Sequence, residues 1–191
     1  NDGDAPKTFS LFSYVEWCLW NADDDMKNFQ RNLSIGEVEI EDSVIYHKTE
    51  YRERRDHFAF YGVNAPIDGF DTSRDAFLGA YRGNDHPQVV EKGACSNSVA
   101  SGWSPIACHQ IDLTLAPGQE KSLIFVLGYA ENPLAEKWSA PGIINKKPAK
   151  EILAKYQTDA QVEQALSALA AYWEDLLSKY HVASSNEKVD R

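Results

Sequence analysis

Apolar side chains alternate with other residues along the start of the chain. On one face of residues 7–20 the alternating positions carry Phe9, Leu11, Val15, Trp17 and Leu19. Ser13 is the only interruption of that face. A period of two residues is typical of a β-strand with one buried face, so the pattern predicts one long strand over residues 7–20.

Three more segments have the pattern of strands. In residues 37–41 acidic residues alternate with β-branched ones, and residues 44–49 resume the strand pattern after the turn-forming pair Asp42-Ser43. This arrangement predicts a hairpin with one solvent-exposed face. Residues 58–63 predict a further strand.

Turn-forming residues dominate the next part of the chain. Residues 64–70 predict a loop, after which Asp71 or Ser73 could cap a short helix that stops at Gly79. Gly, Asn, Ser and Pro recur through residues 81–104, which predicts irregular structure.

The alternation of apolar residues that is typical of a strand returns after this region. Apolar residues at Ile111, Leu113 and Leu115 alternate, Pro117-Gly118 forms a turn, and residues 123–128 are a continuous apolar run. We therefore expect a second hairpin over residues 108–128.

The period of the apolar pattern changes near the C-terminus. A connector with Pro and Gly spans residues 132–148, and Thr158 and Gln161 then have the spacing of a capping box. Apolar residues recur every three or four positions at Val162, Leu166, Leu169, Trp173, Leu176 and Tyr180. Residues 159–180 are therefore predicted to form an amphipathic helix with a buried stripe. Strands followed by helices predict a mainly β fold, an antiparallel β-sandwich with a C-terminal helical tail.

Composition and charge narrow the class of partners. The 191 residues include 19 basic and 29 acidic ones, and the net charge of −10 argues against binding to nucleic acid or to an anionic membrane. No segment has the run of about 18 apolar residues that a membrane span needs. The three cysteines, Cys18, Cys95 and Cys108, are odd in number and lack zinc-site spacing, which argues against a disulfide framework and favours the cytoplasm.

The sequence lacks the spacings by which known catalytic and metal sites are recognised. Signatures of nucleotide-binding loops, α/β-hydrolases and zinc proteases are absent, and the five histidines lack metal-ligand spacing, so we expect neither a cofactor nor a metal. Residues 23–25 are three consecutive aspartates without the spacing of a calcium loop, which favours a solvated loop or a helix start. Residues 51–56 mix both charges, which favours an ion-paired strand end over a phosphate site.

Amide side chains and one arginine lie between the first two predicted strands. They are Asn21, Asn28, Gln30 and Arg31. Amides offer donors and acceptors to sugar hydroxyls, and a guanidinium offers a planar fork to an oxyanion. The nearby Trp17 could face a sugar ring, but its place on the apolar strand face favours the core. From chemistry alone, a sugar or phosphate site and an ordinary polar loop both remain open.

Six stretches of the sequence carry a resemblance to a known family. They are FSYVEWCLWNA at residues 12–22, NFQRN at 28–32, SVIYHKTEYRERR at 43–55, VNAPIDGFD at 63–71, VASGWSPI at 99–106 and FVLGY at 125–129. Together they cover nearly the whole chain. They resemble the cellobiose phosphorylases, which are inverting disaccharide phosphorylases of glycoside hydrolase family 94.

The resemblance implies an architecture. Residues 1–131 would be the later part of an N-terminal β-sandwich of the galactose-mutarotase-like type. Residues 132–191 would be a connector and linker helices leading to a catalytic (α/α)6 barrel outside this sequence. The family's general acid and most of its phosphate ligands lie in that barrel, so we expect residues 1–191 alone to be inactive.

The resemblance also implies a reaction and a site. Inorganic phosphate would attack cellobiose with inversion and give α-glucose 1-phosphate and glucose, without a cofactor. In that family a sandwich loop reaches the active site of the neighbouring subunit of a homodimer. The matching positions here are Asn21, Asn28, Gln30 and Arg31, which would bind the acceptor sugar or phosphate. The alternative is a free-standing carbohydrate-binding or scaffold sandwich, but the apolar stripe of residues 159–180 needs a partner and favours the enzyme.

Overall fold

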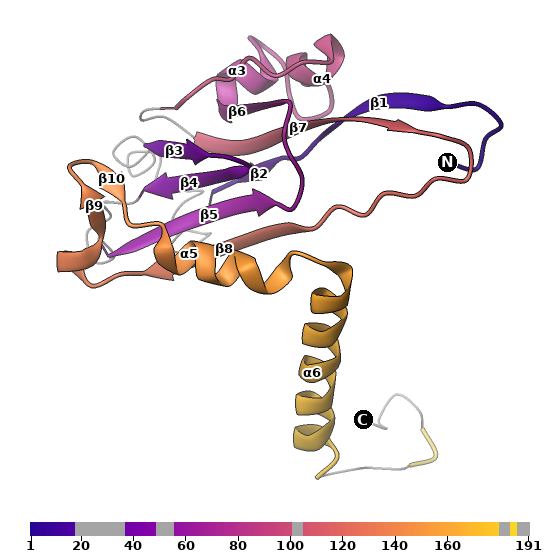
Figure 1. Cartoon of the computed structure of the whole chain (residues 1–191), viewed down its shortest axis with the longest axis vertical. Coiled ribbons are helices and arrows are strands. Elements are labelled where there is room, and N and C mark those ends of the chain that lie inside the picture. Colours follow the sequence, from indigo (N-terminus) through magenta and orange to yellow (C-terminus); the bar gives the residue numbers. More distant parts are fainter. Residues whose placement is uncertain (18–36, 49–55, 101–104, 180–183, 187–191) are drawn as a thin grey trace.

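Two antiparallel sheets form the body of the protein in a computed structural model (Figure 1), which describes residues 1–17, 37–48, 56–100, 105–179 and 184–186. The first sheet contains β1 (Lys7–Phe12), β2 (Val15–Glu16), β6 (Gly69–Ser73) and β7 (Pro105–Leu115). The second contains β3 (Val38–Glu41), β4 (Val44–Lys48), β5 (His57–Val63) and β8 (Phe125–Glu131). The predicted β-sandwich followed by helices is confirmed.

The remaining elements lie outside these sheets. They are a small hairpin of β9 (Trp138–Ala140) and β10 (Ile143–Ile144), the helices α3 (Arg74–Leu78), α4 (Gln88–Lys92), α5 (Lys147–Leu153) and α6 (Asp159–Leu177), and the 3-10 turns η1 (Leu134–Glu136) and η2 (Ala154–Tyr156). The connector predicted over residues 132–148 therefore contains a hairpin and the start of a helix.

The first predicted strand is present but interrupted. β1 and β2 both pair with β7 in one unbroken register, from Lys7 opposite Leu115 to Glu16 opposite Ile106. At Ser13 the backbone N–H still donates to the carbonyl of His109 (3.0 Å), but the backbone N–H of His109 donates to the Ser13 hydroxyl (3.0 Å), so a side chain accepts one of the two bonds of the ladder. The residue that breaks the apolar alternation is thus the residue that breaks the strand. Residues 18–20 lie outside the described residues.

The first predicted hairpin is confirmed and the second is wrong. β3 and β4 pair around the turn at residues 42–43. β7 and β8 belong to different sheets, because β1 and β2 occupy one edge of β7 and β6 occupies the other, while β8 pairs with β5. The turn at Pro117-Gly118 does form, with Gly118 at a φ of 73°. It leads the chain from one sheet to the other.

The structure corrects two other loop predictions. Residues 69–73, partly assigned to a loop, form β6 against β7, and Ser73 then caps α3, which ends before Gly79 as expected. Residues 81–104 include the short helix α4, which buries Val89. A single apolar contact made by a five-residue helix leaves no period in the sequence.

The layers follow from the two faces of each sheet. Between the sheets, Ile45 and Tyr61 pack against Ala107. α3 and α4 cover the outer face of the first sheet, where the cluster consists of Phe77, Leu78, Val89, Ile106 and Cys108. α5 covers the outer face of the second sheet, where Ala149 and Leu153 pack among Tyr46, Phe58, Phe60, Ala130 and Ile144. The order is helices, sheet, sheet, helix.

α6 begins as predicted but is not buried. The Thr158 hydroxyl and the Gln161 side chain form a capping box at its start. No residue of α6 is buried, and Leu166, Leu169, Trp173 and Leu176 are all exposed. Figure 1 shows the helix projecting away from the sandwich. The stripe therefore does not pack against the sandwich of this chain.

A neutral histidine lies between the sheets. His109 has no exposed surface, and its ring packs beside those of Tyr61 and Phe125. Its Nδ1 lies 3.2 Å from the Ser13 hydroxyl, and its Nε2 has no hydrogen-bond partner among the described residues. Burial lowers the pKa of His109 from 6.5 to about 4. The folded protein therefore holds this ring without a charge at neutral pH.

We expect the stability of the protein to fall as the pH drops from 6.5 to about 4. Between these pH values His109 is protonated in the unfolded chain but not in the folded chain. This difference lowers the free energy of unfolding by up to about 3 kcal/mol at the lower pH. His109→Gln should flatten the dependence of the unfolding free energy on pH, whatever its stability at neutral pH. His86→Gln, at an exposed position, is the control and should leave the slope unchanged. Equal slopes in all three proteins would contradict this assignment.

Candidate functional site

The four predicted site residues, Asn21, Asn28, Gln30 and Arg31, lie outside the described residues. So do residues 23–25 and 51–55. The structure does describe the residues on either side of these segments. The segment of residues 18–36 follows Trp17, directly after β2 of the first sheet, and precedes Glu37, directly before β3 of the second.

The described ends of that segment lie at one end of the sandwich. The Trp17 ring stacks on the His47 ring, with centroids 5.5 Å apart, and the backbone of Lys48 donates to the carbonyl of Glu37 (2.9 Å). Lys48 is also the last described residue before segment 49–55. The segment that carries the candidate residues, 18–36, and segment 49–55 therefore start from neighbouring strand ends, although a strand hairpin separates them in the sequence.

Charged and polar side chains occupy this end of the sandwich. Glu16 accepts a hydrogen bond from the Tyr14 hydroxyl (2.6 Å) and from Nε of Arg74 (3.2 Å), and these contacts lower the pKa of Glu16. His57 lies between two carboxylates, with Nδ1 2.8 Å from Asp56 and Nε2 2.7 Å from Glu131. These groups fix the ends of β2, β5 and β8.

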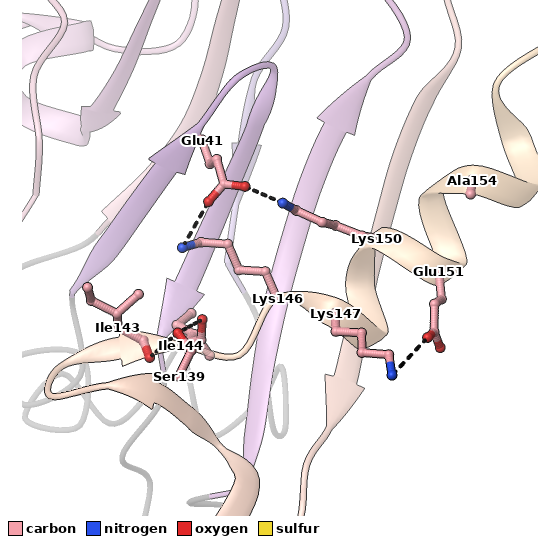
Figure 2. A pocket seen from close by; sticks show the side chains of 9 residues that line it. All are labelled: Glu41, Ser139, Ile143, Ile144, Lys146, Lys147, Lys150, Glu151 and Ala154. Carbon is pink, nitrogen blue, oxygen red and sulfur yellow. Dashed lines mark hydrogen bonds and ion pairs between the residues drawn. The ribbon is translucent and has the colours of Figure 1, made fainter.

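A second cluster joins β3 to α5 and was missed in the sequence. The Glu39 carboxylate lies 2.6 Å from Nζ of Lys146 and 3.5 Å from Nζ of Lys48, and it accepts the backbone N–H of Ile144 (2.9 Å). Glu41 pairs with Lys146 (3.3 Å) and with Lys150 (Figure 2). The face of the hairpin that carries these acids was expected to be solvent-exposed. It is partly covered instead, because Ile144, Lys146 and Lys150 lie over Glu39 and Glu41.

The cluster lines an open cavity of about 530 Å³. Figure 2 shows the Glu41 carboxylate reaching both Lys146 and Lys150, with Ser139, Ile143 and Ile144 below Lys146 in the view. Lys150 and then Lys146 lower the pKa of Glu41. Burial opposes the charge of Lys146, yet its pKa is raised because Glu39 and Glu41 stabilise the ammonium. Lys146 and Lys150 thus pair with the carboxylates of β3. We call Glu39, Glu41, Lys146 and Lys150 the electrostatic staple, because their ion pairs hold α5 on the second sheet.

We expect Lys146→Ala to destabilise the protein by about 1–3 kcal/mol, because it leaves two partly buried carboxylates short of a partner. The neighbouring Lys147→Ala is a matched control. Lys147 lies 4.0 Å from Glu151 and both side chains are largely exposed, so its loss should cost no more than about 0.5 kcal/mol. Denaturant unfolding of both variants measures the difference. Equal losses would contradict the role of the staple.

The part of the chain that the structure describes contains no group of His, Cys, Asp or Glu side chains arranged to hold a metal ion. None of its helices is both long and apolar enough to cross a membrane.

Comparison with known proteins identifies relatives along the whole chain. A family model described as "Glycosyl hydrolase 94, supersandwich domain" matches residues 1–159. N,N'-diacetylchitobiose phosphorylase of Vibrio furnissii is 29% identical over 192 residues, which cover 100% of this chain and 22% of that protein. Solabiose phosphorylase of Paenibacillus borealis is 27% identical over 163 residues, 81% of this chain and 21% of that protein.

A third relative is named as a synthase and not as a phosphorylase. Cyclic beta-(1,2)-glucan synthase NdvB of Rhizobium meliloti is 26% identical over 182 residues, 92% of this chain and 6% of that protein. The chain thus spans 22% or less of each of these three relatives. The region matched by the family model, residues 1–159, extends through β9, β10 and α5 to the first residue of α6.

Proposed function

We propose a function from the premise that the chain belongs to the glycosyl hydrolase 94 supersandwich domain family. It is the non-catalytic sandwich and linker portion of an inverting disaccharide phosphorylase. The parent protein transfers a glycosyl unit from a glucose disaccharide, with cellobiose as the first substrate to test, to inorganic phosphate. The observation that carries the proposal is the family match over residues 1–159, supported by two relatives that are named as disaccharide phosphorylases.

The chemistry expected of the parent needs one general acid, because phosphate replaces the activated water of an inverting glycosidase. We assign that acid to a catalytic barrel beyond the linker helices. The chain's own contribution is the segment of residues 18–36. Its amides and Arg31 would bind acceptor hydroxyls and phosphate in the neighbouring subunit of a homodimer. The segment is joined to the first sheet through Trp17, after β2, and to the second sheet through Glu37, before β3.

The decisive experiment is steady-state phosphorolysis with a set of disaccharides and phosphate. Residues 1–191 alone should give no sugar 1-phosphate above a blank, and the parent protein should give it in proportion to enzyme concentration. Cellobiose, N,N'-diacetylchitobiose and solabiose should be compared side by side. Turnover by residues 1–191 that survives repurification would overturn the assignment of the chemistry to the barrel. Absence of turnover by the parent with any of these sugars would overturn the proposed function.

In the parent enzyme we expect Arg31→Ala to lower kcat/KM about 10- to 150-fold, because a charge-assisted hydrogen bond is worth about 1.5–3 kcal/mol. Arg31→Lys should restore only part of the loss, since an ammonium does not reproduce the guanidinium fork. Thermal unfolding of each variant is measured in parallel. Unchanged kinetics would remove Arg31 from the site, and a loss of activity matched by a loss of folded protein would make it structural.

The stripe on α6 suggests how the linker packs. Its members, Val162, Leu166, Leu169, Trp173 and Leu176, are separated by alternating steps of four and three residues. This is the spacing with which one helix packs along another at a small crossing angle. We therefore propose that a helix of the catalytic barrel covers the stripe in the parent protein.

Trp173→Ala should then destabilise the parent protein by about 3–5 kcal/mol, the usual cost of removing a large buried aromatic side chain. In residues 1–191 alone the same change should cost far less, because Trp173 is 48% exposed there. Gln164→Ala, on the opposite side of α6, serves as the control in both proteins. A loss below about 0.5 kcal/mol in the parent would show that the stripe faces water.

A further inference from the structure

Two cysteine thiols lie side by side behind the first sheet. The Sγ atoms of Cys95 and Cys108 are 3.7 Å apart, and both thiols are free. Cys108 is fully buried in β7, whereas Cys95, three residues after α4, is partly exposed. We propose that this pair is an oxidation site, at which a small-molecule disulfide such as oxidised glutathione converts the two thiols into an intramolecular disulfide.

The backbone on the Cys95 side is held in place by hydrogen bonds. The N–H of Cys95 donates to the side-chain oxygen of Gln110 (2.7 Å). The fully buried Asp71 carboxylate accepts four hydrogen bonds, from the backbone N–H and the hydroxyl of both Ser96 and Ser98. The loop that carries Cys95 is therefore clamped to β6. Since hydrogen bonds already hold the backbone of this loop, we expect the remaining gap between the sulfurs to close by rotation of the side chains.

A glycine makes this close approach possible. A Cβ built on Gly69 of β6 would lie 3.1 Å from Cβ of Cys95 and 3.0 Å from the side-chain oxygen of Gln110. Both distances are shorter than ordinary van der Waals contact. Gly69 therefore allows the Cys95 loop to lie directly on the sheet that contains Cys108.

The chemistry balances in two exchange steps. The Cys95 thiolate attacks one sulfur of the small disulfide, whose S–S bond breaks and releases the first small thiol. The Cys108 thiolate then attacks the Cys95 sulfur of this mixed disulfide and releases the second small thiol. In total the two protein thiols lose two electrons and two protons, and the small disulfide is reduced to two thiols. The exposed Cys95 is the attacking group and the buried Cys108 the resolving one.

The same surroundings make the reaction slow. The Cys108 thiol, burial and the nearby Asp71 carboxylate all raise the pKa of Cys95. Little thiolate is therefore present at neutral pH, and exchange is expected over hours rather than seconds. The product joins residues 95 and 108 in a short ring, which restricts the unfolded chain and should raise the Tm by about 5–10 °C.

The test uses the full chain with Cys18→Ser, which leaves Cys95 and Cys108 as its only cysteines. It is incubated with oxidised glutathione, and its mass and Tm are then measured. We expect the loss of two hydrogens, a higher Tm and reversal by dithiothreitol. Chymotryptic cleavage after Trp103, between the two cysteines, should give two peptides that separate only on reduction. A stable glutathione adduct on Cys95 with Cys108 still free would overturn the proposal.

Two further variants in the same background test the roles of the two thiols. With Cys108→Ser the reaction should stop at the glutathione adduct of Cys95. With Cys95→Ser the folded chain should not react, because Cys108 is buried. Failure of the folded Cys18→Ser chain to react over a day, under conditions in which the urea-unfolded chain forms the disulfide, would also overturn the proposal. That result does not depend on whether either cysteine variant folds, nor on the function proposed above.

Discussion

Burial of the second sheet on both faces is the constraint on which the rest of the fold depends. Every residue of β5 is buried. One face of this sheet meets the first sheet through Ile45 and Tyr61, and the other meets α5 through Phe58 and Phe60. A strand buried on both sides has no polar face, and residues 58–63 of β5 accordingly carry no charged side chain. The neighbouring strand β8 has a glycine opposite Phe60, because a Cβ on Gly128 would lie 2.6 Å from the Phe60 ring.

The outer layer on this sheet is held by charge as well as by apolar contact. α5 has only seven residues, too few to be stable as an isolated helix. Its apolar residues Ala149 and Leu153 pack into the sheet, while Lys146 and Lys150 pair with the acids of β3. The staple therefore determines where the chain leaves the sandwich and where α6 begins.

The end of the sandwich at which β2 and β4 finish lies away from the start of α6. There, the end of β2 leads into residues 18–36, which carry the candidate sugar- and phosphate-binding residues, and Glu16, Arg74 and His57 occupy neighbouring strand ends. A rigid sandwich with its functional residues on connecting segments is a common arrangement, because strands fix the ends of a loop without limiting its chemistry. The supersandwich family match covers both sheets and ends at the first residue of α6.

The sequence by itself determined the elements whose causes are local. Alternation predicted the β3–β4 hairpin, and Ser73, one of two candidate caps, and the Thr158–Gln161 capping box marked helix starts, because each depends on residues within a few positions. The four candidate site residues were found by chemistry and resemblance, and they lie outside the described residues. Only the tertiary structure decided which sheet β7 and β8 enter, that Lys146 covers Glu39, and that Cys95 meets Cys108. These features depend on which distant segments fill the edges and faces of a strand, and a one-dimensional pattern carries no record of that competition.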